Sequence, residues 1–199
     1  MVNEPSFYER MSLKEMRHAD QLIYSMHMIT EIAEAYNDTV DKGHHLCARS
    51  MLDAFYVHIR LLGDFLIKDT KARLDFGPAD FGVSWEKPTS TAAERLADHW
   101  GVASKFVVHF AHPRVPDDLT DLEPFEIGSA PFAEMARDAL EVMERFISAV
   151  EAEAAKATDE PARLSVPRLR ASSLRTAFEH ACARVRVDRT ASSRPLRGS

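Results

Sequence analysis

The sequence predicts an all-α protein that folds as a four-helix up-down bundle and continues into a basic, largely disordered C-terminal tail. Apolar residues recur at helical spacing in four long segments between residues 1 and 156. No segment alternates apolar and polar residues for long enough to indicate a strand. Residues 157–199 hold nine arginines and few large apolar residues, a composition typical of disorder. We therefore expect a bundle domain over residues 1–156 and an Arg-rich tail over residues 157–199, in which residues 171–187 could form a short helix.

The first two helices are marked by capping and turn residues. Ser12 and Glu15 match a capping box, which predicts that the first helix begins at Ser12. Asn37, Asp38 and Gly43 predict its end. The second helix is expected over about residues 44–68, where apolar residues share one face of a helical wheel.

The third and fourth helices follow a long connection. Residues 69–90 are rich in glycine, proline and aromatic residues, which predicts a loop that is either functional or packed by its own aromatics. A third helix is expected from about Thr91 until Pro113 stops it. Pro131 suits the start of the fourth helix, which is expected to reach Lys156.

Composition excludes several classes of protein. Cys47 and Cys182 lie far apart in helical patterns, so they are expected to be reduced thiols. No stretch approaches 18 uncharged apolar residues, and the first ten residues lack the apolar run of a secretory signal. We therefore expect a cytoplasmic protein that does not span a membrane. Phosphate-binding loops, nucleophile elbows and calcium loops are absent from the sequence, so neither a cofactor nor a metal is expected.

One histidine falls on an apolar face. His58 lies near the middle of the apolar face of the second predicted helix, where an imidazole costs free energy unless it is hydrogen-bonded. The favoured interpretation is a core histidine bonded to a hydroxyl or carboxylate of a neighbouring helix, such as Tyr36 or Glu34. The alternative is a metal ligand that acts together with His44.

The end of the third helix carries the main catalytic candidates. His109 shares the polar face of that helix with Lys105, and Arg114 follows just past its end. An imidazole can act as acid or base while nearby cations stabilise an anion such as a phosphodiester. The alternative is a solvated helix face with no chemical role.

The distribution of charge points to a second binding candidate. Residues 1–156 carry a net charge of −11, whereas residues 157–199 carry +5. The tail could therefore contact nucleic acid phosphates through Arg163, Arg168, Arg170 and Arg175. It could equally be a solvated extension.

Several segments together resemble a known superfamily. They are Arg49–Phe55, the Asp75-Phe76 and Asp80-Phe81 pairs with Trp85, and the segment Val108–Arg114. In this pattern, residues 12–150 resemble the HEPN-like helical bundles, and most closely the uncharacterised, abortive-infection-associated branch. The resemblance implies a homodimer with its sites at a two-fold interface, acting in a defence, stress or toxin–antitoxin setting on RNA or on an antitoxin-like protein partner.

The same resemblance bears on catalysis. Active members carry an arginine, then four to six residues, then the histidine, and this pair from two protomers cleaves RNA without a metal. Here Ser104 stands at the expected arginine position, and Lys105 is the nearest cation. We therefore expect binding of RNA or of a protein, with weak or no catalysis. The alternatives are a metal-independent ribonuclease that uses His109 with Lys105 or Arg114, and a purely structural interaction module whose contact surface is the loop from Phe76 to Trp85.

Overall fold

The structure, a computed structural model, describes residues 7–68, 76–108, 131–156 and 166–187. These residues form five α-helices and one short 3₁₀ helix, and they contain no strand. The elements are α1 (Phe7–Asp41), α2 (His45–Leu66), η1 (Pro78–Phe81), α3 (Thr91–Val108), α4 (Phe132–Lys156) and α5 (Val166–Val187). The all-α prediction is confirmed, but a fifth helix replaces the expected four-helix count.

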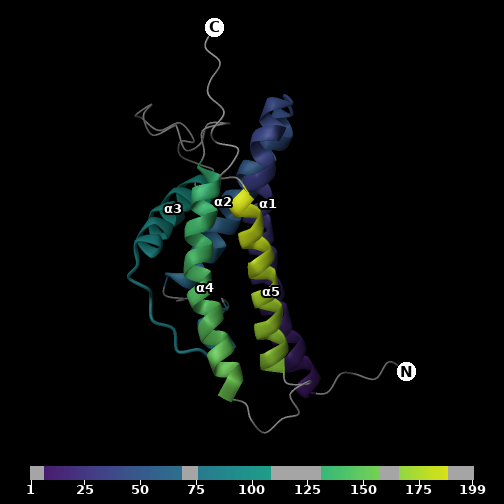
Figure 1. Ribbon diagram of the computed structural model, residues 1–199, viewed down its shortest axis with the longest axis vertical. Helices are drawn as coiled ribbons and strands as arrows, with labels where there is room; N and C mark the ends of the chain where they lie inside the picture. The colour runs from purple at the N-terminus through teal and green to yellow at the C-terminus, as the bar shows by residue number, and fades with distance from the viewer. Residues whose placement is uncertain (1–6, 69–75, 109–130, 157–165, 188–199) are drawn as a thin grey trace, which may run out of the picture.

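The long helices pack side by side. In Figure 1, α1 and α5 run upward and α2 and α4 run downward, while α3 lies tilted at the left edge. α5 packs against both α1 and α4, so the last described helix lies beside the first. α3 packs against α2 and α4 on the opposite side of the molecule.

Local signals in the sequence mark the end of α1 but not its beginning. α1 begins at Phe7, before the predicted start, so Ser12 lies inside the helix and the capping-box prediction is wrong. Gly43, at φ +73°, adopts the left-handed conformation after α1. The N–H of Gly43 donates to the carbonyl of Val40, and the N–H of His44 donates to the carbonyl of Thr39. These two bonds form a Schellman motif, which reverses the chain into α2.

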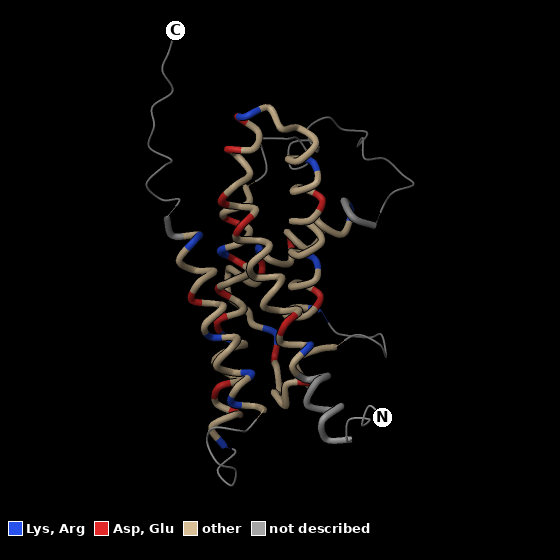
Figure 2. Tube along the Cα trace, turned by 90° about the vertical axis from the view of Figure 1, so that its right-hand side faces the viewer, with Lys and Arg blue, Asp and Glu red and all other residues tan. Residues whose placement is uncertain are grey.

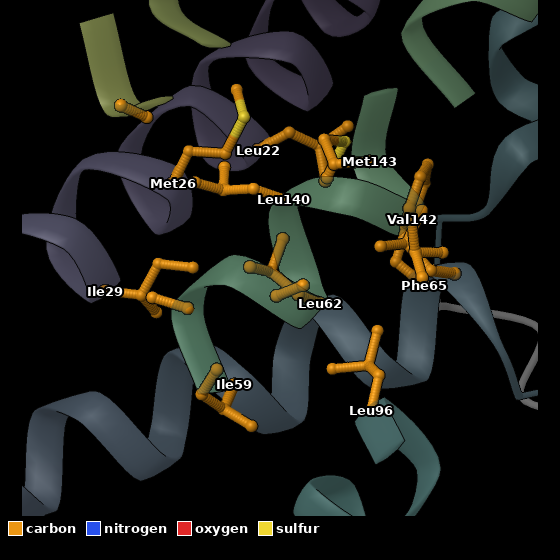
Figure 3. Packing of buried hydrophobic residues seen from close by; sticks show 14 of the residues in the cluster. Leu22, Met26, Ile29, Ile59, Leu62, Phe65, Leu96, Leu140, Val142 and Met143 are labelled. Carbon is orange, nitrogen blue, oxygen red and sulfur yellow. The ribbon is translucent and has the colours of Figure 1, made fainter. Parts of the chain in front are cut away.

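One hydrophobic core unites all five helices. Figure 3 shows side chains from α1, α2, α3 and α4 that point toward one another, including Met26, Leu62, Leu96 and Met143. Their burial supplies the main stabilising free energy, about 25 cal/mol for each Å² of apolar surface removed from water.

α2 and α3 approach closely at one glycine. A Cβ atom added to Gly63 would lie 2.7 Å from Cδ1 of Trp100, which is closer than van der Waals contact allows. The indole N–H of Trp100 donates to Oδ1 of Asp64 at 2.8 Å. The ammonium group of Lys68 lies 3.8 Å from the centre of the Trp100 ring. The missing side chain of Gly63 therefore provides the space that the Trp100 ring fills.

The connection before α3 is packed by its aromatic residues. Phe81 is buried and meets Phe65 and Phe146 edge to face. The indole N–H of Trp85 donates to the carbonyl of Leu66, at the end of α2, at 2.8 Å. These aromatic side chains contribute to the core, so the expected contact surface from Phe76 to Trp85 is not an exposed aromatic loop.

The helix α5 corrects the prediction that the ordered domain ends at residue 156. Its buried side chains include Ala171, Leu174, Ala177, Phe178 and Ala181. Most of them are small, so the helix packs closely without presenting a long apolar stripe. The arginine-rich composition with few large apolar residues indicated a largely disordered tail, in which residues 171–187 could form a short helix. The helix runs instead from Val166 to Val187 and packs against α1 and α4.

Candidate functional site

The described residues contain only part of the predicted sites. Lys105 is exposed in the last turn of α3. His109, Arg114 and Arg163 lie outside the described residues. The grouping of His109 with Lys105 or Arg114 therefore stays a prediction.

A polar cluster that the sequence analysis missed joins α3 to α4. The carboxylate of Asp138 on α4 is only 3% exposed. Nε of Arg95 on α3 donates to its Oδ2 at 2.9 Å, and a second nitrogen of the same guanidinium bonds Oδ1. Nε2 of His99, one turn further along α3, lies 3.0 Å from Oδ2. Both carboxylate oxygens thus have partners from the facing helix.

The electrostatics of this cluster favour an ionised carboxylate. Burial alone would raise the pKa of Asp138, but the hydrogen bonds from Arg95 and His99 outweigh it and hold the pKa below its ordinary value. The guanidinium fork of Arg95 is occupied by that carboxylate, which leaves it poorly placed to grip a phosphate. We interpret the cluster as an ion-pair contact between two helices rather than as a catalytic centre.

A sequence signal for this cluster did exist. Arg95 and His99 lie four residues apart, on one side of α3. Asp138 lies between Met135 and Val142, on the face of α4 that carries the apolar residues. A carboxylate at such a position requires partners from another helix.

Arginines predicted to bind nucleic acid make contacts within the fold. Arg170 is buried; its guanidinium donates to the carbonyls of Asp80 and Phe81 and stacks on the Phe81 ring. Arg175 donates from two nitrogens to the carboxylate of Glu151 on α4. Arg168 is half-buried on the same helix. Arg170 and Arg175 thereby fasten α5 to the rest of the molecule.

The predicted core histidine has a hydroxyl partner. Nδ1 of His58 lies 3.1 Å from Oγ of Ser25 on α1, and both side chains are buried. Burial lowers the pKa of His58, so its imidazole is neutral at pH 7. The interpretation as a hydrogen-bonded core histidine is confirmed, although its partner is Ser25 rather than Tyr36 or Glu34. Across the described ranges, no group of three His, Cys, Asp or Glu side chains is placed to hold a metal.

Apolar side chains are exposed directly above this buried pair. The ring of Tyr24 on α1 meets the His58 ring edge to face, with 5.1 Å between centroids. Tyr24 is 58% exposed, Leu61 51% and Val57 36%. Val57 and Leu61 are one turn apart on α2, and Leu61 is also a helical neighbour of His58. We call Tyr24, Val57 and Leu61 the outer patch.

A shallow groove runs between α4 and α5. Its volume is about 260 Å³, and its floor includes the buried side chains of Leu140, Phe178 and Val185. Glu141 and Arg137, both exposed, lie on its rim, so charges of both signs border it. The half-buried thiol of Cys182 also lines the groove, and neither cysteine forms a disulfide.

Comparison with known proteins identifies no relative: no protein-family model matches the chain, and no curated protein or solved structure matches it significantly. Among the described helices, none is both long enough and apolar enough to cross a membrane.

Proposed function

We propose that this chain is a helical protein-interaction module that binds its partner through the outer patch. The observation that carries the proposal is that three large apolar side chains, Tyr24 on α1 and Val57 and Leu61 on the adjoining α2, are exposed, and that Tyr24 contacts His58, the residue next to Val57. Single exposed apolar residues are ordinary on protein surfaces, whereas a contiguous group indicates an interaction site. Tyrosine is also among the residues that contribute most to binding energy at interfaces.

The support beneath the outer patch favours binding without rearrangement. Tyr24 and Leu61 project from two long helices that pack against each other. The hydrogen bond between Ser25 and His58 joins these helices directly below the exposed ring of Tyr24. A rigid surface loses little conformational entropy on binding, which favours affinity.

Charge favours a protein over RNA as the partner. Figure 2 shows Lys and Arg interleaved with Asp and Glu along the helices. Arg170 and Arg175 are engaged in contacts within the fold. Because residues 1–156 carry a net charge of −11, they repel a polyanion at long range. The HEPN-like relationship and the defence or stress setting are also part of this proposal, and the sequence resemblance alone supports them.

Site-specific photocrosslinking tests the proposal. A photoreactive amino acid replaces Leu61 in one version and Leu169 in another, because these leucines are 51% and 49% exposed on different faces. In cells that express the chain, Leu61 should give a discrete protein adduct and Leu169 should not. The captured protein, once purified, should bind the wild type and bind Leu61→Asp more weakly. Equal labelling from both positions, or no adduct from either, would contradict the proposal.

A further inference from the structure

We infer that the groove between α4 and α5 is a binding site for residues 188–199 of the same chain, which place Leu196 on its apolar floor and arginines beside its acidic rim. These residues lie outside the described part of the structure. The inference is independent of the outer patch, because the groove lies between two other helices. It depends on the shape and charge of the groove, on the composition of the segment and on its attachment to α5.

The groove has the size and lining of a site for an apolar side chain. Its floor is formed by the buried side chains of Leu140, Phe178 and Val185. Its volume of about 260 Å³ is below the range of roughly 300–1,000 Å³ that is typical of pockets for whole small molecules. A single aliphatic side chain that enters the groove would remove the remaining apolar surface of the floor from water, which is favourable.

Two carboxylates border this floor. Glu141 and Glu144 are exposed, lie about one turn apart on α4 and both line the groove. The arginines of α5 that form ion pairs use other acids: Arg175 pairs with Glu151, and Arg184 pairs with acidic residues of α1. A cation from another part of the chain is therefore needed to complement the two carboxylates on the rim.

The segment that follows α5 carries the complementary groups. Leu196 is the only large apolar residue among residues 188–199. Arg194 and Arg197 stand on either side of it, and the segment holds three arginines against one aspartate. An apolar residue between two cations matches an apolar floor beside two carboxylates. Such charge complementarity favours one register of binding over others.

The attachment of the segment places it next to the groove. α4 and α5 run in opposite directions (Figure 1), so the end of α5 lies near the beginning of α4, where Arg137 and Val185 both line the groove. From Arg137 to Glu144 the groove extends for about 10 Å along α4. Residues 188–193 span up to about 20 Å when extended, which lets the chain reverse and brings its later residues over the floor. A tethered segment also acts at an effective concentration in the millimolar range, so weak contacts are enough to hold it.

Alkylation of Cys182 measures whether the groove is covered. Its half-buried thiol lines the groove, so a bound segment should slow its reaction with an uncharged maleimide. Four full-length chains are compared, each with Cys47→Ser so that one thiol reacts. They are the chain with no further change, the chain with a reversed tail (Arg194→Glu and Arg197→Glu), the chain with a reversed groove (Glu141→Arg and Glu144→Arg), and the chain with all four changes.

We expect the tail reversal to have opposite effects in the two grooves. With the acidic groove it should raise the alkylation rate about fivefold or more, because the reversed segment is repelled and the thiol is uncovered. With the reversed groove it should lower the rate by a similar factor, because opposite charges face each other again. Comparing the two tails within each groove removes any direct effect of the groove substitutions on the reactivity of the thiol.

A peptide provides a second measurement. A synthetic peptide of residues 188–199, added at about 1 mM to the chain with the reversed tail, should slow alkylation of Cys182. The same peptide carrying Leu196→Asp should not. Cys47, in chains that carry Cys182→Ser, should react equally fast with either tail, because it is exposed on α2, which does not line the groove. Circular dichroism verifies that each variant is folded.

Each outcome decides the inference. Equal alkylation rates for the two tails in the acidic groove overturn it. A change of the same sign in both grooves excludes the ion pairs and overturns the site with them. Protection that grows with protein concentration would mean that the segment comes from another copy, which overturns binding within one chain. Opposite changes that do not depend on concentration, with protection by the peptide, support the inference.

Discussion

Asp138 illustrates how one buried carboxylate can determine the contact between two helices. Its partners Arg95 and His99 both come from α3, so side-chain hydrogen bonds of this cluster join α3 to α4. Because the Arg95 side chain is 43% exposed, it could regain water if its partner were removed, and this moderates the cost of losing the pair.

Replacing this carboxylate should therefore have a measurable but limited effect. We expect Asp138→Ala to lower the free energy of unfolding by about 1–3 kcal/mol, because it removes several charge-assisted hydrogen bonds in a buried position. Urea denaturation measures the change. Glu141→Ala, which removes an exposed carboxylate from the same helix, should change stability by less than about 0.5 kcal/mol. Equal effects of the two substitutions would show that the cluster does not stabilise the fold.

His58 should make stability depend on pH. Burial lowers the pKa of His58 in the folded state, so the unfolded chain binds the proton first as the pH falls. Stability is therefore expected to decrease as the pH falls from about 6.5 toward the lowered pKa. Denaturation curves between these pH values measure this slope, and His58→Gln should reduce it. His180→Gln, at an exposed position, should leave the slope intact, and a slope unaffected by His58→Gln would refute the assignment.

The ribonuclease alternative can be decided at one residue. Our leading expectation is that the purified chain does not cleave total RNA in EDTA. Cleavage that is lost in His109→Ala, while the circular dichroism spectrum stays unchanged, would instead establish the metal-independent enzyme. Gel electrophoresis of the RNA after incubation gives the answer, with Lys105→Ala as the test of the nearest cation.

At the scale of an element, the contact between α2 and α3 depends on the absence of a side chain at one position. We expect Gly63→Ala to destabilise the protein by about 1–3 kcal/mol, because the added methyl group overlaps Trp100. Gly101 in α3 is a matched control, since a Cβ there meets nothing within 4 Å. Gly101→Ala should stabilise the helix by up to about 1 kcal/mol. Thermal unfolding measures the change in stability that each variant causes. Changes of the same sign in both variants would contradict the close approach of α2 and α3.

α5 should behave as a core helix rather than as an appendage. Ala181 is fully buried, so Ala181→Glu would place a charge in the core and is expected to cost more than about 3 kcal/mol. Thr176→Glu, on the exposed side of the same helix, should cost less than about 0.5 kcal/mol. Chemical denaturation compares the two. Similar values would indicate that α5 contributes little to the folded state.

The helices were predictable to different degrees for physical reasons. α4 closely matches its prediction because Pro131 and a regular apolar stripe mark it locally. α5 was underestimated because alanines bury little area each, and its packing depends on distant partners in α1 and α4. The cluster around Asp138 escaped notice for the same reason, since its hydrogen bonds cross from α4 to α3. The exposure of Tyr24 could not be predicted either, because the spacing of residues along α1 does not show which of them the neighbouring helices cover.

At the scale of the whole molecule, the charge asymmetry has a different meaning from the one that the sequence indicated. The positive net charge of residues 157–199 suggested a surface for polyanions. In the structure, Arg184 of α5 pairs with Glu31 and Glu34 of α1, and Arg175 pairs with Glu151 of α4. Arginines of α5 thus lie against acidic residues of the helices that it covers. The opposite charges of the two regions of the chain favour their docking to each other.

The placement of α5 beside α1 also has consequences while the protein is being made. A ribosome releases α1 long before α5, and the bond between Arg184 and Glu34 joins residues 150 positions apart. Until α5 has emerged, the apolar sides of α1 and α4 that it will cover remain open to chaperones, proteases and other nascent chains. These surfaces of the nascent chain are therefore most vulnerable in the interval between the release of α4 and the release of α5.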